Sequence, residues 1–194
     1  MRKGALAVLL GILLLSGCNA KEVIKAPGVK VDTPALRTLK QQAHIETCPT
    51  TAAGKATDGL PDVTLPCLGG GPSVNLARLR GPLVVNFWAQ SCGPCRKELP
   101  EYQAFSRTYA GKVGVLGIDW QDTQPDLAIG FARETGATYP QLTDVSGLAR
   151  LRPPALPQLY LIDAAGKVVF REAIQVTSEQ QLEHLVATHL GVSR

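Results

Sequence analysis

Two cysteines separated by Gly-Pro are the residues of this chain best suited to chemistry. Cys92 and Cys95 follow an apolar run at residues 83–88, and a helical pattern begins at the second cysteine. Two thiols at this spacing can close a small disulfide. The N–H groups and the dipole of a helix N-terminus also stabilise a thiolate. The pattern therefore predicts thiol–disulfide chemistry at the junction of a buried strand and a helix.

Length and composition limit what else the chain can be. It has 194 residues, of which 45% are hydrophobic, enough for one well-filled domain with tails. The net charge is +4, and the positive and negative residues are scattered along the chain. Only 5% of the residues are aromatic. Without a basic block or an aromatic stacking platform, we expect no nucleic-acid partner.

The amino terminus has the pattern of an export signal. Arg2 and Lys3 precede an apolar run at residues 5–15, which is shorter than the roughly 20 residues of a membrane-spanning helix. The run ends in Leu-Ser-Gly-Cys, which looks like a bacterial lipobox. We therefore expect residues 1–17 to be a signal peptide and Cys18 to be lipidated. The alternatives are a plain signal peptide or an uncleaved anchor, with Cys18 incidental.

The remaining chain divides into a tether and one domain. Residues 18–58 read as a lipid-tethered linker with a possible short helix, because Thr33 offers an N-cap and Pro34 a first helical residue. Residues 59–194 read as a single folded domain. Export would place this domain in an oxidising compartment, where disulfides persist.

Cys48 and Cys67 stand outside the Cys-Gly-Pro-Cys motif. A structural disulfide between them would close a loop of about 20 residues and stabilise the fold by on the order of 3 kcal/mol. The alternative is a zinc site of four thiolates with Cys92 and Cys95. Such sites present two close pairs, and Cys48 and Cys67 are not close in sequence. An electron relay to the Cys92–Cys95 pair is a further possibility without sequence support.

The expected elements alternate between strands and helices. A Gly-Gly-Gly-Pro turn at residues 69–72 lacks the Lys-Ser/Thr of a phosphate loop and reads as a hairpin connection. Together these elements predict an α/β fold with a mixed sheet. We expect strands at residues 61–67, 83–88, 113–118, 159–163 and 168–173, and helices at 95–110, 125–135 and from Ser178 onward.

The motif and its surroundings resemble a known family. Residues 86–100 read NFWAxxCGPCRxELP, which is similar to the TlpA/ResA branch of the thioredoxin superfamily. Residues 117–122, 139–140 and 157–166 are similar to cytochrome c maturation thioredoxins of the CcmG type. The resemblance covers about residues 60–190. It implies a thioredoxin fold, with a mixed central sheet flanked by helices and an N-terminal β extension.

The resemblance implies a role for individual residues. Cys92 would be the exposed nucleophile and Cys95 the buried resolving thiol. Pro157 would be a cis-proline facing the disulfide, with the backbone of Leu156 presented to the substrate. The alternative for Pro157 is an ordinary trans proline in a loop. The rest of the active-site surround would be Trp88, Gly93, Pro94 and Asn86.

Two residues depart from the pattern of ordinary thioredoxins. Ser91 stands where the family usually has Trp, and Asn86 stands where ordinary thioredoxins have a buried Asp that accepts a proton. The resemblance implies that an acid farther along the chain takes this role. Asp122 is the candidate and Asp119 its near rival, although either could instead be a solvated loop carboxylate.

The resemblance also implies a function and partners. The protein would reduce disulfide-bearing protein substrates, such as apocytochrome c, and take electrons from a membrane thiol–disulfide transporter. It would lie on the outer face of the cytoplasmic membrane or on the periplasmic side, held by its lipid anchor. No cofactor and no metal are expected, because the two thiols carry the electrons.

Other functions remain open on the sequence alone. The same fold could serve an oxidant of secreted proteins. A peroxidase would need a Thr-x-x-Cys motif, which does not precede Cys92. A copper chaperone of the SCO type would use the two cysteines with a distant histidine, such as His184 or His189. A lipoprotein with an inert disulfide is the remaining alternative.

Overall fold

A computed structural model describes residues 28–150 and 155–194 of the chain. The expected signal peptide and the lipidation residue Cys18 lie outside these residues. No helix in the described part of the chain is long and apolar enough to cross a membrane.

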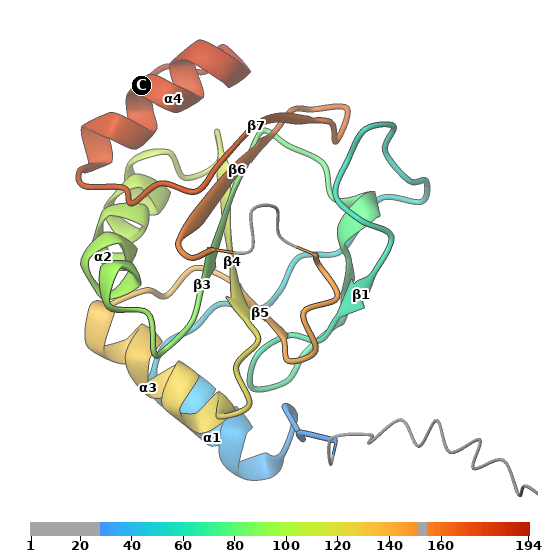
Figure 1. Cartoon of the computed structure of the whole chain (residues 1–194), viewed down its shortest axis with the longest axis vertical. Coiled ribbons are helices and arrows are strands. Elements are labelled where there is room, and N and C mark those ends of the chain that lie inside the picture. Colours follow the sequence, from blue (N-terminus) through green and yellow to red (C-terminus); the bar gives the residue numbers. More distant parts are fainter. Residues whose placement is uncertain (1–27, 151–154) are drawn as a thin grey trace, which may run out of the picture.

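The centre of the fold is a mixed sheet of five strands in the order β5-β4-β3-β6-β7 (Figure 1). β3 (Leu83–Trp88) runs parallel to β4 (Gly114–Trp120), which runs parallel to β5 (Gln141–Asp144). On its other side, β3 is antiparallel to β6 (Gln158–Ile162), and β6 is antiparallel to β7 (Val168–Glu172). The predicted α/β class and the mixed sheet are confirmed.

Helices cover one face of this sheet. α2 (Gly93–Thr108) contacts both α3 (Pro125–Thr135) and α4 (Glu179–Leu190), and α3 also contacts α1 (Pro34–Gln42). Figure 1 shows these helices on one side of the sheet, with β1 on the opposite side. The α3 helix ends at Gly136, whose φ of 71° is the left-handed conformation that favours glycine.

The opposite face is covered by an N-terminal hairpin. β1 (Thr64–Leu65) pairs antiparallel with β2 (Val74–Asn75), and a short 3-10 helix, η1 (Leu76–Arg78), follows. Gly69, Gly70 and Gly71 all have positive φ in the turn between the two strands, which glycine adopts without a Cβ clash. The hairpin connection predicted from these glycines is confirmed.

The central strand is buried on both faces, and its side chains alternate between two cores. Val84 and Trp88 join the core under the helices, whereas Val85 and Phe87 join the core under the hairpin. This arrangement explains why the run at residues 83–88 is apolar almost throughout. Asn86 shares the face of Val84 and Trp88, so its amide lies under the helices.

The short helix expected before the domain is also present. The Thr33 hydroxyl accepts a hydrogen bond from the Leu36 N–H at 3.2 Å, and Pro34 is the first helical residue. Leu36 is buried in the same core as α3. The helix therefore packs on the domain, and the boundary drawn at residues 58 and 59 stays a prediction.

One strand was not expected from the sequence. β5 consists of Gln-Leu-Thr-Asp, and all four residues are buried. Its polar side chains are held by interior hydrogen bonds: the Gln141 side-chain oxygen accepts from the Trp88 indole at 2.9 Å, and the Asp144 carboxylate accepts from the Leu148 and Ala149 N–H groups. These bonds replace the apolar pattern by which a buried strand is recognised.

Candidate active site

Cys92 and Cys95 meet at the end of β3 and the start of α2. They form a disulfide with a Cα–Cα distance of 5.3 Å. Cys92 is the N-cap of α2, and its Sγ accepts a hydrogen bond from the Cys95 N–H at 3.2 Å. Cys92 is half-buried, whereas Cys95 has no exposed surface. One sulfur is thus accessible to a partner, at a helix end that favours its thiolate, and the other is enclosed.

The residues around the motif hold this turn in place. The Cys92 N–H donates to the Ala89 carbonyl at 3.0 Å, and Gly93 and Pro94 occupy the first turn of α2, where a proline costs no helical hydrogen bond. Trp88 is fully buried and stacks on Phe131 with ring centroids 5.3 Å apart. Trp88 therefore anchors the end of β3 from inside the protein.

The structure places Pro157 at the start of β6. The Leu156–Pro157 peptide bond is cis, as the resemblance implied, so the alternative of a trans loop proline is wrong. Phe87 pairs with Gln158, which brings Pro157 alongside the end of β3 that leads to Cys92. Pro157 is buried, and Leu156 is half-buried against the core.

Asp119 and Asp122 are both buried, so the alternative of a solvated loop carboxylate is wrong for each of them. Asp122 accepts hydrogen bonds from the Gln90 N–H at 3.4 Å and from the Gln124 N–H at 2.8 Å. Its carboxylate thus lies against the backbone of the loop that leads to Cys92. Asp119 is fully enclosed, and burial together with the neighbouring Asp122 raises its pKa well above the ordinary range.

Glu98 is a buried acid to which the sequence reading gave no role. It lies three residues after Cys95 and therefore one turn along the same face of α2. One carboxyl oxygen accepts from the Val176 N–H at 3.0 Å, and the other has no hydrogen-bond partner among the described residues. Burial raises the pKa of Glu98 to about 8. The signal in the sequence was the Cys-x-x-Glu spacing, which places the two side chains together on one helix.

Glu98 belongs to a buried polar cluster with Tyr102 and Tyr139. The Tyr139 hydroxyl donates to the Asn86 side-chain oxygen at 3.2 Å. Burial, with the nearby Glu98 carboxylate, raises the pKa of both Tyr102 and Tyr139. The Asn86 amide nitrogen and the Tyr102 hydroxyl have no hydrogen-bond partner in the described part of the chain. Buried polar groups without a hydrogen-bond partner cost free energy, and here the Tyr102 hydroxyl lies near one titratable acid, Glu98.

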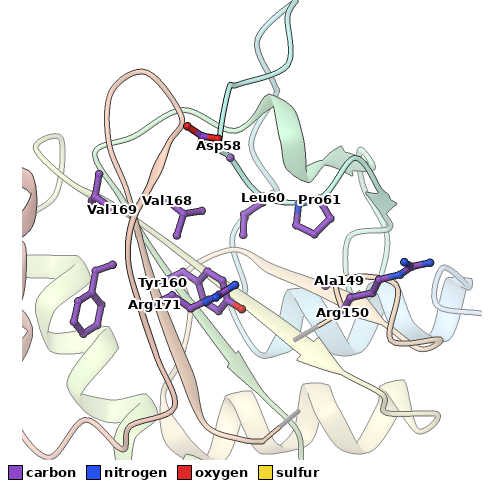
Figure 2. A pocket seen from close by; sticks show the side chains of 11 residues that line it. Asp58, Leu60, Pro61, Ala149, Arg150, Tyr160, Val168, Val169 and Arg171 are labelled. Atoms are coloured by element: carbon purple, nitrogen blue, oxygen red, sulfur yellow. The ribbon is translucent and has the colours of Figure 1, made fainter. Parts of the chain in front are cut away.

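One cavity in the described part of the chain lies away from the two cysteines. It has a volume of about 650 Å³ and lies between the segment before β1 and the strands β6 and β7 (Figure 2). Leu60 and Tyr160, which line it, belong to the core on the hairpin face of the sheet. None of the four described cysteines lines this cavity, so it is not part of the redox site.

No metal centre is formed by the described residues: no group of three or more His, Cys, Asp or Glu among them is arranged to hold a metal ion. His184 and His189 are exposed on α4, where His189 packs on the Phe170 ring.

Comparisons with known proteins agree with this geometry. The sequence model of the AhpC/TSA family matches residues 56–171. The chain belongs to this family. It is similar to the thiol:disulfide interchange protein HelX of Rhodobacter capsulatus, with 33% identity over 72% of this chain and 78% of HelX. It is also 33% identical to the thiol-disulfide oxidoreductase ResA of Bacillus anthracis over 58% of this chain and 66% of ResA.

A solved structure supports the same grouping. The crystal structure of a thiol:disulfide interchange protein DsbE from Chlorobium tepidum superposes with a TM-score of 0.58 and 28% identity, over 72% of this chain and all of that one. The thioredoxin-like fold is therefore confirmed. With its disulfide at the N-terminus of α2, this protein is a thiol-disulfide oxidoreductase of the DsbE/ResA kind.

Proposed function

We propose that this protein is a membrane-tethered, extracytoplasmic reductase of disulfides in exported proteins, with apocytochrome c as its substrate. The observation that carries the proposal is the half-buried Cys92 at the N-cap of α2, bonded to a fully buried Cys95. The tether rests on the lipobox pattern that ends at Cys18, and the direction of electron flow rests on the Gly-Pro dipeptide between the two cysteines. The apocytochrome assignment rests on the CcmG-like stretches of the sequence.

The reaction proceeds by two exchanges. The Cys92 thiolate attacks one sulfur of the substrate disulfide, so that a mixed disulfide forms and one substrate thiolate leaves. The Cys95 thiolate then attacks the Cys92 sulfur and releases the second substrate thiolate. The substrate gains two electrons and two protons, and the Cys92–Cys95 disulfide is regenerated. An external membrane dithiol protein then reduces the pair again.

Deprotonation of Cys95 is the demanding step, because burial disfavours its thiolate. A proton acceptor works best when its pKa lies near that of the donor and near the working pH. Glu98 has a pKa raised to about 8, near a neutral working pH, and lies one turn from Cys95 on α2. Asp122 contacts the backbone of the loop before Cys92, so its role is to position that loop.

Trapping tests the proposed substrate. In the Cys95→Ala variant the second exchange is absent, so an oxidised Cys-x-x-Cys-His peptide from apocytochrome c should accumulate as a mixed disulfide with Cys92. The adduct is measured by mass spectrometry under non-reducing conditions. The Cys92→Ser/Cys95→Ala variant is the matched control and should form none. The apocytochrome assignment is wrong if the peptide forms no more adduct than an oxidised peptide of scrambled sequence.

A further inference from the structure

The second disulfide has an unusual electrostatic environment. Cys48 and Cys67 are joined and buried, with 3% and 1% of their surfaces exposed. The Lys40 ammonium lies 3.0 Å from Cys67 Sγ and donates to the Gly70 carbonyl at 2.8 Å. Lys40 itself is only 8% exposed. A purely structural disulfide gains little from such a neighbour, because a disulfide sulfur is a weak acceptor.

The other sulfur also has a partner that suits its reduced form. Cys48 Sγ lies 3.3 Å from the Gln141 backbone carbonyl, which can only accept a hydrogen bond. After reduction, a Cys48 thiol would donate to this oxygen and a Cys67 thiolate would accept from Lys40. Each product of reduction therefore has a hydrogen-bond partner next to the place where it forms.

Reduction of the disulfide would also stabilise the Lys40 ammonium. Burial lowers the pKa of Lys40, because an enclosed ammonium without an anionic partner is unfavourable. Within the described residues no salt bridge joins Lys40 to a carboxylate, and Asp32, the acidic group whose charge favours its ammonium, is bound to Arg37. A Cys67 thiolate would supply the missing anion at hydrogen-bonding distance.

We propose that Cys48–Cys67 is a second redox centre, which an external dithiol reduces to a Cys48 thiol and a Cys67 thiolate paired with Lys40. One thiolate of the dithiol attacks Cys48 Sγ, the Cys48–Cys67 bond breaks, and Cys67 leaves as the stabilised thiolate. The second thiol of the dithiol then attacks the mixed disulfide and releases Cys48, which takes a proton. The dithiol becomes a disulfide, two electrons pass to the protein, and one of the two dithiol protons goes to solvent.

The surroundings of the disulfide include open space on the Lys40 side. A cavity of about 260 Å³ is lined by Lys40, by Thr47, which precedes Cys48, and by the glycine turn. A Cβ placed on Gly71 would lie 3.5 Å from Cys67 Sγ, so the glycine turn packs beside this sulfur without a side chain.

A redox titration in the Cys92→Ser/Cys95→Ser background tests the proposal independently of the proposed reductase function. Cys48 and Cys67 are equilibrated with dithiothreitol and read by alkylation and mass spectrometry. Lys40→Met should lower the equilibrium constant for reduction at least about tenfold, which corresponds to about 30 mV. Lys112→Met, which removes an exposed lysine charge from the turn before β4, is the matched control and should leave the constant within threefold.

Two results would overturn the proposal. One is an equal constant for the Lys40→Met and Lys112→Met proteins. The other is loss of the near-ultraviolet circular dichroism of the parent protein when Cys48–Cys67 is reduced, since the centre must cycle in the folded state. If Lys40→Met does not fold, the Cys92→Ser/Cys95→Ser protein with Lys40 intact provides the test. Its reduced Cys67 should be alkylated by iodoacetamide at pH 7 at least threefold faster than Cys48, and equal rates would contradict a Cys67 thiolate.

Discussion

Replacing Cys92 by Ser is expected to reduce the rate of disulfide reduction by on the order of 10³-fold or more, because a hydroxyl does not replace the attacking thiolate. The loss should be large for any disulfide substrate, since Cys92 is the half-exposed member of the pair. Insulin reduction with dithiothreitol as the electron source measures it. The variant should remain folded, because serine can keep the N-cap hydrogen bond of α2.

The matched control removes the other disulfide. A Cys48→Ser/Cys67→Ser protein should keep at least half of the parent activity towards insulin, because neither residue lies at the N-terminus of α2. The assignment of the active pair would be wrong if activity followed Cys48 and Cys67 and survived in Cys92→Ser.

Replacing Glu98 by Gln should slow the second exchange about 100-fold at pH 7, since general acid–base catalysis contributes roughly 10²–10⁴. The amide keeps the shape and can still accept from the Val176 N–H, but it cannot take the proton of Cys95. Stopped-flow measurement of mixed-disulfide resolution isolates this step. Asp122→Asn is the matched control, and we expect it to slow resolution less than tenfold. A larger effect for Asp122→Asn than for Glu98→Gln would return the proton acceptor to Asp122.

The pH dependence of stability tests the raised pKa of Glu98. Glu98 titrates at a pKa of about 8 in the folded protein, above its value of about 4.3 in the unfolded chain. Between these values the folded state holds a proton that the unfolded state has lost. Its contribution to stability is therefore complete below the unfolded pKa and falls by about 1.4 kcal/mol per pH unit as pH rises towards 8. Glu98→Gln should lack this decline in urea unfolding series between pH 5 and 8.

The position of the redox pair could be predicted from the sequence because local signals agree there. An apolar strand, the two cysteines and a helical stripe follow one another directly, so Cys92 and Cys95 had to meet at the start of α2. The hairpin before β3 could also be predicted, because three consecutive glycines followed by proline favour a tight turn. In the structure all three glycines have positive φ.

Other features depend on contacts between distant residues. β5 is buried yet polar, and the partner that stabilises Gln141 is Trp88, which lies 53 residues earlier in the chain. Glu98 was missed because a charged residue in a helical pattern usually faces solvent, and its hydrogen bond comes from the Val176 backbone, 78 residues later in the chain. The placement of Lys40 against Cys67 likewise depends on tertiary packing.

The midpoint potential of Cys92–Cys95 tests the central claim most directly. It can be read in the parent protein by equilibration with glutathione or dithiothreitol buffers, alkylation and mass spectrometry that separates this pair from Cys48 and Cys67. A reductase should show a value more negative than about −180 mV and closer to the −270 mV of thioredoxin. A value near the −120 mV of the strong oxidant DsbA would contradict the account and make this protein an oxidant of exported substrates.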